Sequence, residues 1–180
     1  MNLSRIFNLG RQGYLYLIFG LGWLQPVFLL VIRLHWGWQF FITGKGKLGN
    51  IPKISDFFGS LGIPFPTLNA YLAGSTECFG GLCLLLGLAS RVTMVPLIFT
   101  MIIAYATAEH EALQSFFSDP DKFTGADPFL FMLTAIIVLL FGPGALSVDG
   151  LLKRLLSRKA QKTPSAVTKP SLAMFPGESK

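Results

Sequence analysis

"LNAYLAGSTECFGGLCLLLGL", Leu68–Leu88, is the stretch that decides the fold. It places a single carboxylate, Glu77, inside a run of apolar and small residues. A helix that crosses a bilayer core needs about 20 mainly apolar residues, which this run supplies. Three more stretches have a comparable character: Leu24–Thr43, Val92–Ala108, and Pro128–Phe141 with a continuation toward Val148. The pattern predicts an all-α membrane protein whose core is a four-helix transmembrane bundle.

The composition agrees with a chain that lies in a bilayer. Of the 180 residues, 52% are hydrophobic and 13% are charged, a balance that soluble domains of this size rarely show. We predict three parts: an interfacial N-terminal segment (1–23), the transmembrane domain (24–150) and a basic, largely disordered tail (151–180). The tail has too few large apolar residues to offset the cost of ordering it. Its basic start would contact anionic lipid headgroups, and nucleic acid is not an expected partner.

The distribution of basic residues predicts the orientation. The tail is the most basic part, and an even number of crossings puts both termini on one side, so both termini are predicted to be cytoplasmic. The acidic loop 109–127 then faces outward. The loop 44–66 faces outward too, although its three lysines count against this orientation. Its phenylalanines and prolines predict a short helix and an extended piece on the membrane surface.

Two ionisable residues fall well inside the predicted spans, Arg33 in "LVIRLHWGWQFF" and Glu77 in "STECFGG". If the spans end near Gly44 and begin near Leu68, the helical rise puts Arg33 about 16 Å and Glu77 about 14 Å from the outer surface. A lone charge at the bilayer centre costs at least about 3 kcal/mol, so such residues usually face the bundle interior and pair. We therefore predict an Arg33–Glu77 ion pair as the polar core.

Small residues occupy the helix face around Glu77: Ala73, Gly74, Gly80 and Gly81. They predict either close packing of a neighbouring helix or space for a ligand. Further side chains could support the polar core from three helices: His35, Trp36, Thr100 and Thr134. Two interpretations of the pair stay open, a structural pair that fixes helix register and a proton-responsive or substrate-binding site.

A rival topology takes the uncharged run Gly13–Ile32 as the first span. Arg33 would then lie at a membrane surface and Glu77 would be unpaired. Against it, the aromatic stretch "LHWGWQFFI" would be left outside the core, and Pro26 would interrupt a helix instead of starting one.

The ordered pieces of the sequence resemble the DoxX family of bacterial membrane proteins. The resemblance covers about Val31–Gly150 and rests on Arg33 followed by four segments: "GWQFFITGKGKL", "FFGSLGIPFP", "ECFGGLCLLLGLASR" and "FGPGALSVD". It implies a four-helix fold in the bacterial inner membrane and carries the intramembrane Arg and Glu over to Arg33 and Glu77. The segments "WGWQFF" and "TECFGG" are similar to those of a subset that accompanies metal-related modified peptides. The family supplies no catalytic motif to transfer.

The resemblance implies an accessory or redox-associated membrane subunit in a quinone-linked or an oxidative or thiol-stress complex. A quinone is then the candidate cofactor, although the sequence leaves the cofactor open, and the candidate partners are the lipid bilayer and other membrane or soluble redox proteins. A buried carboxylate flanked by glycines also fits a small-solute or proton-coupled transporter. The third alternative is a non-enzymatic maturation or assembly partner. We see no metal-ligand spacing, nucleotide-binding loop or nucleophile with its base, so an autonomous enzyme has the least support, and the catalytic residues and oligomeric state stay open.

Overall fold

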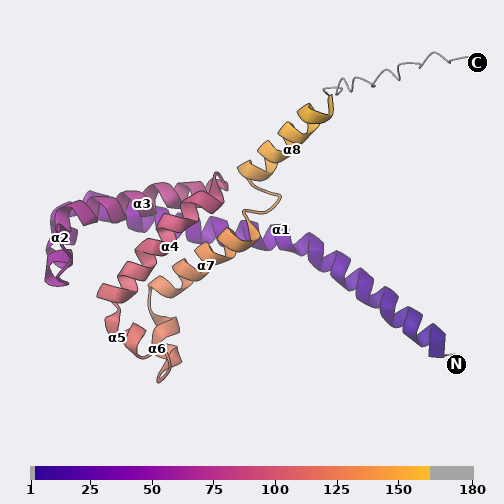
Figure 1. The fold of residues 1–180 in the computed structure, drawn as a ribbon, viewed down its shortest axis with the longest axis horizontal. Helices are drawn as coiled ribbons and strands as arrows, with labels where there is room; N and C mark the ends of the chain where they lie inside the picture. The colour runs from indigo at the N-terminus through magenta and orange to yellow at the C-terminus, as the bar shows by residue number, and fades with distance from the viewer. Residues whose placement is uncertain (1–2, 163–180) are drawn as a thin grey trace, which may run out of the picture.

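The computed structural model describes the backbone of residues 3–162 and the side chains of residues 11–158. Within the described backbone the chain is helical throughout, apart from turns and short connections (Figure 1). The helices are α1 (Leu3–Gly49), α2 (Ile51–Ser60), α3 (Pro66–Leu86), α4 (Ser90–Thr107), α5 (His110–Gln114), α6 (Pro120–Gly125), α7 (Pro128–Phe141) and α8 (Val148–Lys162). The predicted all-α class is confirmed, and so is the short helix in the loop 44–66, which is α2.

Helices α1, α3, α4 and α7 pack together, with α3 alongside the second half of α1 and α7 alongside α4 (Figure 1). Their shared core contains Phe40, Leu84, Leu97, Met101 and Val138. By length and composition, α1 and α4 are apolar enough to cross a membrane, and α7 is a shorter apolar helix. The structure therefore shows two to three strongly apolar helices within a packed group of four.

Glycines bring the backbones of α1 and α3 into direct contact. Gly37 and Gly44 on α1, like Gly74 and Gly81 on α3, are separated by two helical turns and share one face. A Cβ atom on Gly44 would lie 2.3 Å from the backbone nitrogen of Cys78, and one on Gly81 would lie 2.5 Å from that of Phe41. Small residues allow this approach, as they do between membrane helices generally. The contact sets the register in which α1 and α3 pair.

The tight turn between α3 and α4 is held by the first turn of α8. Gly87 has φ of 69° and ends α3 in the left-handed conformation, which glycine adopts without strain. Asp149 then accepts hydrogen bonds from the backbone N–H groups of Ala89 (2.8 Å) and Ser90 (3.0 Å) at the start of α4. A carboxylate at a helix N-terminus satisfies unpaired donors and is favoured by the helix dipole. The "SVD" segment therefore closes one end of the bundle.

The first half of α1 extends away from the other helices (Figure 1). Its apolar side chains from Tyr14 to Phe28 are mostly exposed. With 47 residues, α1 is about 70 Å long, which exceeds the roughly 30 Å thickness of a bilayer core. The helix continues without a break through the predicted boundary at residues 23 and 24, and it includes Pro26.

The start of the predicted disordered tail is helical in the structure. Helix α8 continues to Lys162, and its leucines at 151, 152, 155 and 156 have the spacing of one helix face. The remainder of that predicted tail, residues 163–180, lies outside the described residues.

Candidate functional site

Arg33 lies at the end of the bundle that contains the α3–α4 turn. Its side chain is buried, with 1% of its surface exposed. The guanidinium donates to the carbonyl oxygens of Leu84 (3.1 Å), Leu85 (3.4 Å) and Leu146 (3.3 Å), and to that of Pro143. The first two carbonyls belong to the last turn of α3, where backbone acceptors have no partner within the helix. Arg33 thus joins α1 to the C-terminus of α3 and to the loop between α7 and α8.

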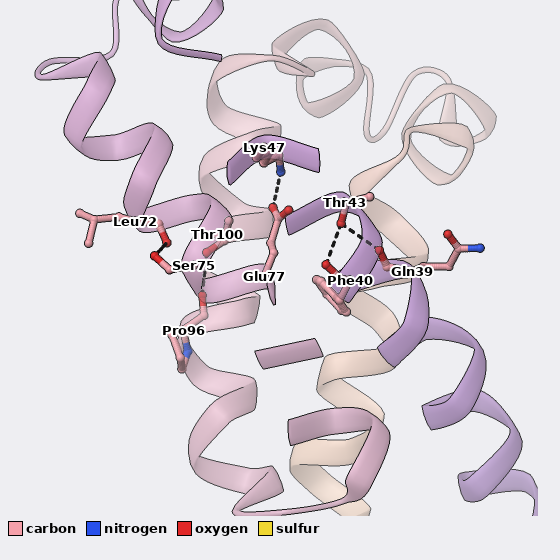
Figure 2. A network of polar contacts seen from close by, with 9 residues as sticks. All are labelled: Gln39, Phe40, Thr43, Lys47, Leu72, Ser75, Glu77, Pro96 and Thr100. Atoms are coloured by element: carbon pink, nitrogen blue, oxygen red, sulfur yellow. Dashed lines mark hydrogen bonds and ion pairs between the residues drawn. The ribbon is translucent and has the colours of Figure 1, made fainter. Parts of the chain in front are cut away.

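Glu77 pairs with Lys47 of α1, as Figure 2 shows. Its side chain is 1% exposed, whereas that of Lys47 is 29% exposed. The Lys47 ammonium donates to Oε1 of Glu77, while Oε2 is buried without a hydrogen-bond partner among the described residues. The site therefore contains one buried carboxylate that a partly exposed lysine neutralises and that has unused acceptor capacity.

The predicted Arg33–Glu77 ion pair is wrong, because the two side chains lie at different levels of the bundle. The glycine contacts place Gly44 opposite Cys78 and the Arg33 guanidinium against Gly87. In this antiparallel register, Arg33 lies about eleven residues, or roughly 16 Å along the axis, from the level of Glu77.

The prediction was wrong because it assumed that the first span ends near Gly44. Helix α1 instead continues to Gly49 and brings Lys47 opposite Gly74. The rival topology also fails to describe Glu77, since the carboxylate is paired.

A cavity of about 820 Å³ adjoins the Lys47–Glu77 pair. Residues of α1, α2, α3, α4 and α7 line it, and most of the lining is apolar. Hydroxyl and amide groups are interspersed in this lining: Gln39, Thr43, Asn69, Thr76, Thr100 and Thr107. Glu109 and Asp127 belong to the lining as well. A mostly apolar wall with a few polar groups is the composition that small-molecule pockets commonly have.

Comparison with known proteins identifies the relatives of this chain. The DoxX family profile matches residues 28–110. The "Putative oxidoreductase CatD" of Bacillus subtilis (strain 168) is 32% identical over 120 residues, which cover 67% of this chain and 83% of that protein. This chain belongs to the DoxX family. The "Uncharacterized membrane protein Rv3486" of Mycobacterium tuberculosis is 35% identical over 147 residues, covering 75% of this chain and 85% of that protein. No solved structure gives a significant match.

The sequence segments that resemble the DoxX family lie in two regions of the structure. Arg33, the "GLASR" turn and the "FGPGALSVD" segment meet at one end of the bundle through the contacts of Arg33 and Asp149. The pieces "GWQFFITGKGKL" and "TECFGG" meet at the α1–α3 contact and contribute Lys47 and Glu77 to the cavity. The first place closes the bundle, and the second adjoins the space that a ligand could occupy.

The other residues that the sequence singled out have separate positions in this DoxX protein. Gly74 and Gly81 face α1, Gly80 faces Leu97 of α4, and Ala73 lines the cavity. The face around Glu77 is thus filled by helices on two sides and opens to the cavity at Ala73. Thr100 also lines the cavity and donates to the carbonyl of Pro96 at 2.9 Å (Figure 2).

The remaining candidates make no hydrogen bond to Arg33 or Glu77 within the described part of the chain. His35 is exposed and lies edge-on to Trp36, with ring centroids 5.0 Å apart. Trp36 packs edge-on against Phe131, also at 5.0 Å, and Thr134 is buried in α7. Trp36 therefore takes part in aromatic packing and not in the polar core.

Lys47 is the functional candidate that sequence reasoning missed in this DoxX protein. In the sequence it is one of three lysines in a loop whose predicted orientation they oppose. The signal that could have found it is that same misfit: a lysine where an outer loop should be depleted of positive charge. A lysine just beyond an apolar run can extend its long side chain toward a buried carboxylate on the next helix.

Proposed function

We propose that this DoxX protein is an accessory, redox-associated membrane subunit that holds a quinone or quinol in the cavity beside Lys47 and Glu77. The observation that carries the proposal is the mostly apolar cavity of about 820 Å³, whose wall contains the ion pair between the partly exposed Lys47 and the buried Glu77. Its volume is within the range of about 300–1,000 Å³ that small-molecule pockets occupy. The relative from Bacillus subtilis whose name contains "oxidoreductase" supports a redox association.

The wall of the cavity favours a ligand that arrives from lipid. Leu72 on α3 and both Phe99 and Ile103 on α4 line the cavity, and each is also exposed on the flank of the bundle. An apolar ligand tail can therefore extend between α3 and α4 toward the hydrocarbon. The polar groups inside supply donors and acceptors for ring oxygens, and a carboxylate can exchange the protons that accompany quinone reduction.

We further propose that α1, α3, α4 and α7 all cross the bacterial inner membrane and that both termini are cytoplasmic. The tight α3–α4 turn with Arg91 and the basic residues of α8 lie at the Arg33 end of the bundle, which supports a cytoplasmic position for that end. The cavity then occupies the outer half of the membrane, below α2. Partner redox proteins would contact this subunit within or beside the membrane.

A cavity-filling substitution tests the quinone proposal. Ala104 lines the cavity from α4, and Ala104→Phe places a ring in the space that the ligand would occupy. We expect the affinity for decylubiquinone to fall by at least about tenfold, which corresponds to about 1.4 kcal/mol. Binding is measured by calorimetry on protein in lipid nanodiscs.

The matched control is Ala106→Phe, because Ala106 is exposed on the same helix and does not line the cavity. We expect it to bind decylubiquinone like the wild type. Equal binding by both variants and the wild type would show that the cavity is not a quinone site.

Transport is the second candidate, favoured by the two carboxylates near the other end of the cavity. Glu109 and Asp127 border the connections α4–α5 and α6–α7, so they offer a polar route between the cavity and the aqueous side. If the protein is a proton-coupled carrier, proteoliposomes acidified outside should accumulate substrate, and Glu77→Gln should abolish this uptake. A quinone-binding subunit without carrier activity should give equal signals with wild type, variant and empty liposomes.

A further inference from the structure

Lys47 and Glu77 both line the cavity, and the two side chains differ in exposure. The side chain of Lys47 is partly exposed, whereas that of Glu77 is almost fully buried. An ammonium has three N–H donors, and the described contacts of Lys47 use one of them, toward Oε1 of Glu77. The more exposed group of the pair is therefore a cation with N–H donors that the described contacts leave unused.

We propose that Lys47 binds an ionised oxygen on the ring of a lipid-soluble ligand, and that Glu77 takes up a proton as Lys47 transfers its hydrogen bond to that ligand. The chemical class is a hydroxyquinone or an ionised quinol with an apolar tail. This inference rests on the proposed quinone function and assigns separate roles to the two residues of the pair.

The physical reason is the cost of a buried carboxylate without a counter-charge. Oε2 of Glu77 already has no hydrogen-bond partner among the described residues. Once Lys47 turns toward a ligand, the carboxylate would be a buried anion without the one cation that pairs with it among the described residues, which strongly disfavours the ionised form. Protonation of Glu77 removes that cost. The pair therefore couples the binding of one negative charge to the uptake of one proton.

The proton balance depends on the ligand, and no electrons move in this step. A ligand that is already ionised leaves Glu77 to take its proton from water. A quinol that is still protonated loses its O–H bond, Glu77 gains one, and Lys47 stabilises the resulting oxyanion. The second case prepares a quinol for oxidation by a partner protein.

The other charged groups of the cavity lie farther from Glu77. The Gly80–Leu97 contact between α3 and α4 places Glu77 at the level of Thr100. Glu109 follows about nine residues later, or roughly 13 Å along α4, and Asp127 precedes the start of α7. The lining contributed by α2 has no charged residue in the described chain. Lys47 is therefore the charged group that faces Glu77, and Glu77 is the proton acceptor.

Two matched probes test this coupling on full-length protein in lipid nanodiscs. One is 2-hydroxy-3-decyl-1,4-naphthoquinone, whose hydroxyl is ionised at neutral pH, and the other is its neutral 2-methoxy analogue. We expect binding of the hydroxy probe to take up about one proton, detected with a pH indicator in weak buffer. Because binding takes up a proton, its affinity should fall about tenfold for each unit of rising pH while the probe stays ionised. The methoxy probe should bind with no proton uptake and no pH dependence.

Variants of the pair separate the two roles. Lys47→Met should weaken the hydroxy probe about 10- to 100-fold, the effect of one hydrogen bond to a charged group, and spare the methoxy probe. The matched control is Lys45→Met, because Lys45 is exposed on the same helix and lies outside the cavity lining. Glu77→Gln should bind the hydroxy probe at least as tightly as the wild type, since it frees Lys47, but should take up no proton.

The outcomes distinguish this inference from the function on which it rests. If both probes bind in the cavity, as shown by their loss in Ala104→Phe, but neither takes up a proton, the inference is wrong and the quinone function stands. Proton uptake that persists in Glu77→Gln also overturns the inference. If neither probe binds the wild type, the proposed function itself is wrong.

Discussion

Gly44→Ala should lower the free energy of unfolding more than the addition of a methyl group at any other glycine of α1. Its new Cβ would lie 2.3 Å from the backbone nitrogen and 2.8 Å from the Cα of Cys78. A clash with backbone cannot be relieved by a rotamer change, so α1 and α3 must separate along their glycine contact. Overpacking usually costs about 1–3 kcal/mol, and we expect the free energy of unfolding to fall by at least the upper value. SDS titration in mixed micelles measures it.

The same substitution two residues later is the control. Gly46 has no atom within 4 Å of an added Cβ, and alanine is favoured over glycine in a helix by up to about 1 kcal/mol. Gly46→Ala should therefore be neutral or slightly stabilising, opposite in sign to Gly44→Ala. Equal effects of the two substitutions would contradict the direct backbone contact between α1 and α3.

Arg33→Gln should have the second large effect, through the loss of a side chain that serves four backbone carbonyls at once. A glutamine is shorter and has a single amide group, so most of these partly buried acceptors lose their donor, although the Leu84 carbonyl still accepts from the N–H of Gly87. Each such group costs about 1–3 kcal/mol, and we expect a total loss of at least about 3 kcal/mol. The same SDS titration measures this loss.

Two further variants define what Arg33 does. Arg91→Gln is the control, because Arg91 is on the surface and its side chain makes one hydrogen bond among the described residues, to the Leu140 carbonyl at 3.4 Å. Its removal should change the free energy of unfolding by less than about 1 kcal/mol.

Arg33→Lys keeps the positive charge but loses the planar guanidinium with its several N–H donors, so part of the stability should be lost. Because Arg33 lies at the end of the bundle away from the cavity, folded Arg33→Lys protein should still bind decylubiquinone normally. Unchanged stability with lost binding would instead place Arg33 in the ligand site.

Much of the fold followed from local patterns. Apolar runs located α3, α4 and α7 to within a few residues, because apolar length and helix-ending glycines are encoded locally. The boundary of the first helix did not follow, since the sequence from Leu3 to Gly49 has no residue that ends a helix outright; Pro26 and the two lysines near Gly44 are tolerated within it. Helix α1 continues past the expected end near Gly44 to Gly49. This extension places Lys47 in the bundle, where it pairs with Glu77.

The sequence by itself determined that this chain is an all-helical membrane protein, and that Glu77 and Arg33, as charges among apolar residues, each need a partner. Composition and burial cost are enough for those conclusions. Only the tertiary structure decided which groups pair with Glu77 and with Arg33. The pairing of charges on neighbouring helices depends on axial register, and here the register is set by backbone contact between Gly44 and Cys78. That contact brings Lys47 to Glu77 and Arg33 to the C-terminus of α3, because a shape fit between two helices is a property of neither segment alone.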